Sequence, residues 1–231
     1  MTSDCQTILG VANSRSWVPG GVRSRRVALV TAYAVIAAAV VGFGWLLTHP
    51  WAGSVGRVDD DVARWFASQR SPGLNRLADV VTFVADTWVG VLVALGVAVT
   101  LWRLDRSWRG PLVVVAAVVG HLGVYLLATA VDPRDRPPVP ILDPGLVPTH
   151  SFPSGHVGTA VVAYGSLALL LAVRLRRPLW RRATVTLLLA VAPLVALSRL
   201  YQGAHHLTDV LTSLVYAWAW LAVLLVRPAE P

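Results

Sequence analysis

The sequence contains no lysine, because all 20 of its basic residues are arginine. A strong coding bias produces such a pattern without any functional cause, so the absence of lysine does not define a function. Cysteine is also scarce: the single Cys5 lies in the polar N-terminal segment. One cysteine excludes an internal disulfide and leaves the redox compartment open.

Charged residues are few, at 14% of the chain, whereas 55% of the residues are apolar and the mean hydropathy is +0.62. In a soluble domain, about a quarter of the residues are charged. This composition therefore indicates a membrane protein. The net charge of +8 does not predict nucleic-acid binding, because the arginines neither form one patch nor alternate with exposed aromatic residues.

Long apolar runs predict the fold class. A helical crossing of the bilayer needs about 20 mostly apolar residues, and six runs meet this requirement: 27–48, 77–102, 111–131, 153–173, 183–200 and 206–226. The first run is too long for a signal-peptide core and lacks a convincing cleavage site after it, so we expect it to be retained. The chain is predicted to be all-α, with a six-span domain over 27–226 after a disordered cytoplasmic tail over 1–26.

The arginines predict the orientation of these spans, because short cytoplasmic loops carry an excess of positive charge. Three segments hold most of them, and six crossings place all three on the same side: the N-terminal tail, the loop at 103–109 and the loop at 174–182. Both termini are therefore expected in the cytoplasm, in a multi-pass protein of the cell membrane.

The opposite side holds the stretch "VDDDVARWF". A helix there places Val58, Val62, Trp65 and Phe66 on one face with charged residues opposite, a pattern typical of a helix lying in the headgroup layer. A polar loop with a chance apolar stripe is the alternative.

Three polar segments fall on this same extracytoplasmic side. They are "DPRDRPP" after the third run, "PSGH" at the start of the fourth and "SRLYQGAHHLTD" between the fifth and sixth. Polar and ionisable groups are expensive near a bilayer and usually mark a functional site. Taken singly, each segment also has a structural interpretation, such as helix capping, an interfacial histidine pair or a basic loop. Their convergence on one face favours a shared site.

The residue types in these segments suit phosphate chemistry. The start of a helix at Ser154 and Gly155 offers free N–H groups to an anion, within reach of His156. His205 and Asp209 are four residues apart, so on a helix they share a face, and the carboxylate can orient the imidazole for nucleophilic attack. The sequence has no carboxylate cluster for magnesium and no His/Cys spacing for zinc, so neither a metal nor a cofactor is expected.

The motifs resemble those of the type 2 phosphatidic acid phosphatases, which share their site architecture with vanadium-dependent haloperoxidases. Pro153-Ser154-Gly155-His156 matches the second family motif, and Ser198-Arg199 with His205 and Asp209 matches the third. The first motif is partial. Arg136-Pro137 supplies its end, but Thr129 occupies the position of the family's lysine.

This resemblance implies a role for each motif residue. His205 would be the nucleophile that forms a phosphohistidine, Asp209 would orient it, and His156 would serve as general acid and then general base. The phosphoryl oxygens would be held by four residues: Arg136, Arg199, Ser154 and Gly155. Because Thr129 leaves one charge missing, we also expect Arg134 to be recruited to the phosphate.

The sequence therefore predicts a metal-independent phosphatase acting on a lipid phosphomonoester or diphosphate at the outer membrane surface. The candidate substrates are phosphatidic acid, phosphatidylglycerol phosphate and a polyprenyl diphosphate such as undecaprenyl diphosphate. We slightly prefer the polyprenyl diphosphate. Two alternatives stay open: an inactive membrane protein that binds a lipid phosphate headgroup, and a vanadate-binding protein of the haloperoxidase type.

Overall fold

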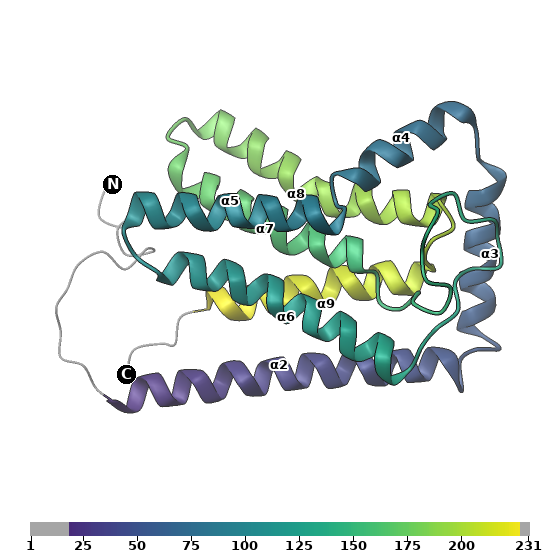
Figure 1. Cartoon of the computed structure of the whole chain (residues 1–231), viewed down its shortest axis with the longest axis horizontal. Helices are drawn as coiled ribbons and strands as arrows, with labels where there is room; N and C mark the ends of the chain where they lie inside the picture. Colours follow the sequence, from purple (N-terminus) through teal and green to yellow (C-terminus); the bar gives the residue numbers. More distant parts are fainter. Residues whose placement is uncertain (1–18, 227–231) are drawn as a thin grey trace.

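The computed structural model describes residues 19–226, which form an all-helical bundle (Figure 1). The described residues form eight helices: α2 (Pro19–Thr48), α3 (Val55–Ser68), α4 (Pro72–Phe83), α5 (Thr87–Asp105), α6 (Arg109–Val131), α7 (Gly155–Arg174), α8 (Pro178–Tyr201) and α9 (Leu207–Leu225). The predicted fold class is confirmed.

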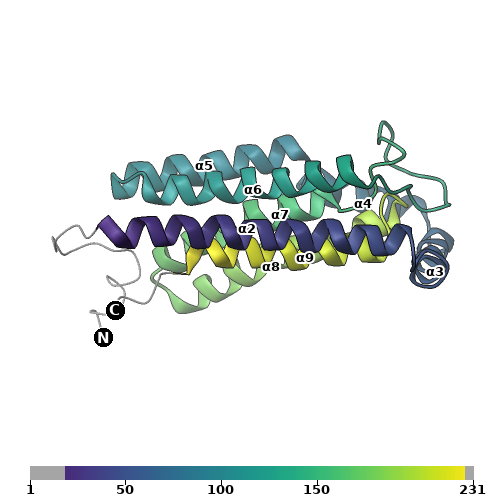
Figure 2. The ribbon, with the colours of Figure 1, turned by 90° about the horizontal axis from the view of Figure 1, so that it is seen from below.

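Six of these helices, α2 and α5 to α9, are long and apolar enough to cross a bilayer. They lie side by side with their long axes roughly parallel (Figures 1 and 2). The loops 106–108 and 175–177 lie at one end of this bundle, together with the start of α2 and the end of α9. Helix α3 and the loop 132–154 lie at the other end. The sequence prediction of six crossings is therefore correct.

Helix α7 lies in the middle of the bundle, where it packs against α5, α6, α8 and α9. Its small residues permit this close packing. A Cβ atom at Gly158 would lie only 2.1 Å from Cε1 of the buried His121 on α6. His121 is held there by Tyr216, whose hydroxyl lies 2.8 Å from Nδ1, and by Thr159, whose Oγ1 lies 3.2 Å from Nε2. The backbone of α7 thus touches a buried polar group directly.

The second crossing differs from the prediction of one continuous run over 77–102. Helix α4 ends at Phe83, and a new helix, α5, begins at Thr87. The backbone N–H of Ala85 donates to the carbonyl of Thr82 (2.9 Å), which ends α4 in a turn. The carboxylate of Asp86 then caps α5 by accepting from the N–H of Trp88 (3.1 Å). Because apolar residues lie on both sides of Asp86, hydropathy alone did not reveal the break.

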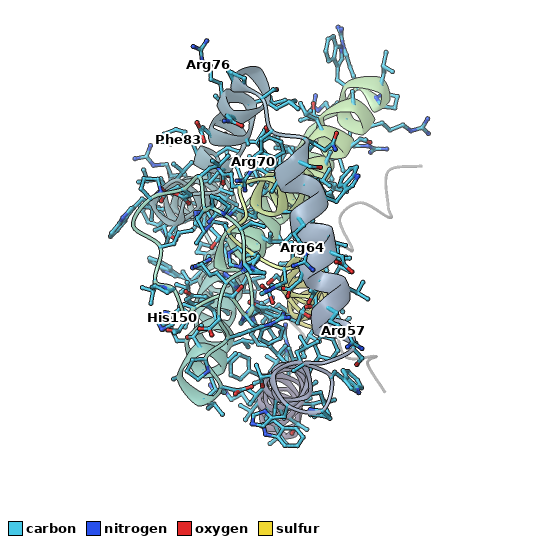
Figure 3. All side chains as sticks on the ribbon, turned by 90° about the vertical axis from the view of Figure 1, so that its right-hand side faces the viewer. Arg57, Arg64, Arg70, Arg76, Phe83 and His150 are labelled. Atoms are coloured by element: carbon cyan, nitrogen blue, oxygen red, sulfur yellow. The ribbon has the colours of Figure 1, made fainter. Side chains whose placement is uncertain are left out.

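Helix α3 forms where an interfacial helix was predicted and lies across the ends of the spans (Figures 1 and 3). Val58 and Trp65 of the predicted stripe are exposed. The side that faces the protein instead carries Asp59 and Ala63, each 1% exposed. A charged residue of α3 is thus buried on the side that faces the protein, although the sequence pattern placed the charged residues on the solvent-exposed side.

The predicted tail over 1–26 only partly overlaps the described structure. Residues 19–26 belong to the first turns of α2, so the helix begins earlier than the apolar run indicated. The rest of the predicted tail, including Cys5, lies outside the described residues.

Candidate active site

The three polar segments converge at the end of the bundle that carries α3. The start of α7, the junction of α8 and α9 and the loop 132–154 surround a cavity of about 110 Å³. Its lining combines three histidines and an arginine with apolar and hydroxyl groups: Thr87, Leu122, Tyr125, Arg136, Leu146, His150, Gly155, His156, Thr159 and His205. Figure 3 looks onto this end and shows His150 on the loop, with Arg57 and Arg64 along α3.

His205 is buried at 3% exposure in the turn between α8 and α9. Its Nδ1 lies 2.6 Å from the carbonyl oxygen of Ser151. A carbonyl can only accept, so Nδ1 must carry the proton and donate it, which leaves the lone pair on Nε2. Burial lowers the pKa of His205 to about 4, with the charges of Arg199 and Arg136 adding to the decrease and Asp209 opposing it. At neutral pH the side chain is a neutral imidazole of fixed tautomer.

Asp209, at the start of α9, is placed differently from the expectation that it accepts directly from His205. Its Oδ2 lies 3.8 Å from Nδ1 of His205, beyond hydrogen-bond distance. That oxygen instead accepts from Oγ of Ser151 (2.6 Å) and from the backbone N–H of His206 (2.8 Å). Asp209 therefore holds the segment whose carbonyl orients the imidazole, and it acts on His205 through its charge rather than through a direct hydrogen bond.

Arg134 does not line the cavity, contrary to the expectation that it is recruited to the phosphate. It is 7% exposed and lies between two buried carboxylates. Nη1 donates to Oδ1 of Asp209 (2.5 Å), and Nη2 donates to Oδ2 of Asp59 (2.8 Å). The two carboxylates outweigh the effect of burial and raise the pKa of Arg134 above its usual value. Its two terminal nitrogens therefore donate to carboxylates of the protein and do not point into the cavity.

Thr129 makes no contact that would replace a lysine. Its hydroxyl donates back to the carbonyls of Tyr125 (3.0 Å) and Leu126 (3.1 Å) in its own helix. Tyr125, one turn earlier on α6, does line the cavity, and its ring would contact a Cβ atom placed on Gly155. The cavity wall on α6 is thus formed one turn before the predicted position.

Arg136 lines the cavity, but most of its donors are used by the backbone. Nε donates to the carbonyl of Val147 (2.9 Å), Nη2 to that of His150 (3.0 Å) and Nη1 to that of Ala204. Burial and the charge of Arg199 lower the pKa of Arg136. It ties the loop 132–154 to the turn before α9 and places positive charge at the cavity wall.

Arg199 and Ser154 keep unused donors. Arg199 is fully buried, and its Nη1 donates to Oδ2 of Asp143 (2.7 Å) and to Oε1 of Gln202 (2.9 Å). Among the residues that the structure describes, Nε and Nη2 of Arg199 and Oγ of Ser154 have no hydrogen-bond partner. Buried donors are nearly always paired. Three unpaired donors on two motif residues indicate a site for an anion.

His156 occupies the second position of α7, immediately after Ser154 and Gly155, and lines the cavity together with His205. Four of the eight predicted site residues line the cavity: Arg136, Gly155, His156 and His205. Ser154 directly precedes Gly155 at the start of α7, and the charge of the buried Arg199 acts on His205. Arg134 and Asp209 pair with each other outside the lining. Sequence reasoning missed four residues that contribute here: Asp59, Asp143, His150 and Ser151. Of these, only Asp59 left a signal, as one of three consecutive aspartates in "VDDDVARWF".

Comparison with solved structures identifies the fold. The crystal structure of a transmembrane PAP2-type phosphatidylglycerolphosphate phosphatase from Bacillus subtilis is similar, with a TM-score of 0.68 and 21% identity over 86% of this chain and 92% of that chain. The crystal structure of Aquifex aeolicus LpxE is also similar, with a TM-score of 0.55 and 16% identity over 71% of this chain and 93% of that chain. No curated protein sequence matches the chain.

The sequence model of the PAP2 superfamily matches residues 110–230, just over half of the chain. The chain belongs to the PAP2 superfamily. It is a membrane lipid phosphate phosphatase of this superfamily, with six helices able to span the bilayer.

Proposed function

We propose that the chain hydrolyses a lipid phosphomonoester or diphosphate through a phosphohistidine on His205, without a metal ion. The observation that carries this proposal is the set of unpaired buried donors, Nε and Nη2 of Arg199 and Oγ of Ser154, close to a neutral histidine. These donors can bind phosphoryl oxygens, while the Nε2 lone pair of His205 can attack phosphorus.

In the first step, Nε2 of His205 attacks the phosphorus atom as the bond from phosphorus to the lipid oxygen breaks. His156, in its protonated form, gives its proton to the departing oxygen, so that the lipid leaves as an alcohol or a lipid monophosphate. The Nδ1–H bond to the Ser151 carbonyl keeps the imidazole in the tautomer that can attack. The positive charge that develops on the ring is stabilised by the nearby carboxylate of Asp209.

In the second step, neutral His156 takes a proton from water as the water oxygen attacks phosphorus. The bond between phosphorus and Nε2 breaks, and inorganic phosphate leaves. His205 returns to its neutral form and His156 is again protonated. One acid/base group serves both steps, as expected for a two-step displacement.

Charge compensation in both steps falls to the donors around the cavity. Arg199 and Ser154 supply unpaired donors, and Gly155 lies in the first turn of α7, where backbone N–H groups have no partner within the helix. Arg136 adds positive charge at the wall. Fixed donors of this kind stabilise the transition state without reorganisation.

A lipid substrate fits the position of the cavity. It lies at the end of the spanning helices and is bounded by residues of α5, α6 and α7, including the apolar Leu122. A phosphate group there would leave its hydrocarbon tail in the bilayer. Polyprenyl diphosphate, phosphatidic acid and phosphatidylglycerol phosphate all have this form, and we keep a slight preference for the polyprenyl diphosphate.

A phosphate-release assay on purified protein with these three lipids, with and without EDTA, tests the proposal. We expect release from at least one lipid, no loss with EDTA and no turnover in His205→Ala. His156→Ala should be strongly impaired and should accumulate phosphoenzyme from a substrate whose leaving group needs no proton. Lipid binding without release would favour a headgroup-binding protein. Peroxide-dependent halide oxidation with vanadate would favour a haloperoxidase.

We also propose that the site faces the extracytoplasmic side, as the arginine-rich loops at the other end indicate. A topology reporter inserted within 138–148 should be extracytoplasmic, and one within 176–180 should be cytoplasmic. The reverse result for both reporters would move the chemistry to the cytoplasm.

A further inference from the structure

We propose that Asp59, on the interfacial helix α3, is a positioning residue for the phosphatase reaction and acts through Arg134 on Asp209. This inference rests on the proposed function. It extends the site beyond the three motifs to a helix that lies outside residues 110–230, where the family model matches.

A continuous chain of buried contacts joins Asp59 to the nucleophile. Asp59 is 1% exposed, Arg134 is 7% exposed and Asp209 is fully buried. The guanidinium bridges the two carboxylates through separate nitrogens, at 2.8 Å to Asp59 and 2.5 Å to Asp209. Asp209 in turn accepts from Ser151, whose carbonyl oxygen binds His205. No solvent-exposed group interrupts this sequence of contacts.

The charges along this chain determine what Asp59 does. The carboxylates of Asp59 and Asp209 share the guanidinium of Arg134, so these three side chains together carry a net negative charge beside the histidine. Neutralising Asp59 would leave Arg134 to compensate Asp209 alone. The remaining field would then favour the imidazolium less, and it is the imidazolium charge that develops on His205 when it attacks phosphorus. We therefore expect Asp59 to act on the chemical step rather than on substrate binding.

Asp59 also has a structural contact that must be separated from this effect. Its Oδ1 accepts from the backbone N–H of Thr208 (3.1 Å) in the first turn of α9, and the Thr208 hydroxyl also donates to Oδ2. A carboxylate at a helix N-terminus stabilises the helix. The same hydroxyl also accepts from Nη1 of Arg134 (2.8 Å). Thr208→Val removes both hydroxyl contacts but keeps the two carboxylates, the guanidinium charge and the backbone bond, so this variant reports the structural contribution apart from the charges.

The first arm of the test compares kcat and KM. Asp59→Asn keeps the size of the side chain and an acceptor oxygen. Asp61→Asn is the matched control, because Asp61 is exposed and, within residues 19–226, pairs only with the exposed Arg64. We expect Asp59→Asn to lower kcat by about tenfold to a hundredfold, the range found for the loss of a partner that orients a metal-ligating residue, which is a comparable orienting role, with KM changed less than about threefold. Asp61→Asn and Thr208→Val should keep wild-type kcat to within about threefold.

The second arm needs no catalysis. In protein labelled with 15N-histidine, the His205 resonance is assigned as the one that is missing from the spectrum of His205→Ala. Its chemical shift, measured against pH, reports the protonation of His205. Charged or titratable groups that face this ring are Asp209 on α9, Arg199 on α8, His156 on α7 and Arg136 on the loop, and all stay the same in the variants. We expect the midpoint to move to lower pH in Asp59→Asn and to stay unchanged in Asp61→Asn and Thr208→Val.

Each outcome is decisive. Wild-type kcat and an unchanged His205 titration in Asp59→Asn would overturn the inference, as would an equal loss of kcat in Thr208→Val with no change in titration. If wild-type protein released no phosphate from any lipid, the proposed function would fail while the titration would still test the contact chain.

If Asp59→Asn did not fold, Arg134→Lys would be measured instead. The single ammonium of lysine cannot bridge both carboxylates in the same way. Unchanged kcat and an unchanged His205 titration in Arg134→Lys would also overturn the inference.

Discussion

Ser151 holds His205 through its backbone: the carbonyl oxygen of Ser151 lies 2.6 Å from Nδ1 of the imidazole. The side chain of the same serine points to a different partner, donating to Oδ2 of Asp209 (2.6 Å). The tautomer of the proposed nucleophile is thus fixed by the main chain, and the carboxylate fixes the position of that main chain.

Ser151→Ala should lower kcat only moderately, by about threefold to tenfold. The variant loses one hydroxyl bond to Asp209, worth about 0.5–1.5 kcal/mol, but keeps the carbonyl that orients His205. Steady-state kinetics measures the effect. Ser166→Ala is the control, because the Ser166 hydroxyl donates to the carbonyl of Val162 in its own helix (2.6 Å). A complete loss of activity in Ser151→Ala would contradict the assignment of the carbonyl as the main contact.

Arg134→Ala should mainly reduce stability. Removing the guanidinium leaves Asp59 and Asp209 buried without a counter-charge, and breaking a buried ion pair in this way costs about 3–5 kcal/mol. Thermal unfolding in detergent measures the loss. Arg64→Ala is the matched control, because its pair with Asp61 is exposed and contributes about 0–1 kcal/mol. Normal stability combined with a large increase in KM would instead favour direct binding of phosphate by Arg134.

Gly158→Ala should destabilise the bundle and reduce activity. The added methyl group would lie 2.1 Å from the His121 ring. Relief requires either that the ring give up its bonds to Tyr216 and Thr159 or that α6 and α7 move apart. Overpacking of this kind typically costs about 1–3 kcal/mol. Gly96→Ala on α5 is the matched control, since a Cβ atom there meets nothing within 4 Å. Equal unfolding temperatures for the two variants would show that α7 packs less tightly than the structure indicates.

Stability should fall as the pH decreases from about 6.5 to about 4, in part because of His205. Burial lowers the pKa of His205 from 6.5 to about 4, so in this range the unfolded chain binds a proton that the folded protein excludes. Above pH 6.5 the side chain is neutral in both states and its contribution is constant. The difference in unfolding temperature between pH 7 and pH 5 should be smaller in His205→Gln than in wild type. The same difference in both proteins would argue against the low pKa.

The sequence predicted the spans because each is a long apolar run, and it predicted the three motifs because their residue types and spacing are specific. It did not predict the break at Asp86, since the break depends on one capping carboxylate within an apolar stretch. The partners of Arg134 also could not be predicted from the sequence. Asp59 and Asp209 are each 75 residues away from it along the chain, whereas Asp132 and Asp135 are its neighbours in sequence.

The contact between His205 and a main-chain carbonyl affects how this site responds to mutation. Every amino acid carries the same carbonyl group, so a substitution at position 151 removes the bond to Asp209 but not the acceptor for His205, provided that the new side chain fits this fully buried position. Substitutions at position 151 would therefore report the fit of the buried side chain and the bond to Asp209, and they would not reveal the role of the carbonyl. The same site can nonetheless be lost through a small displacement of the backbone, caused by substitutions at residues that never touch the imidazole.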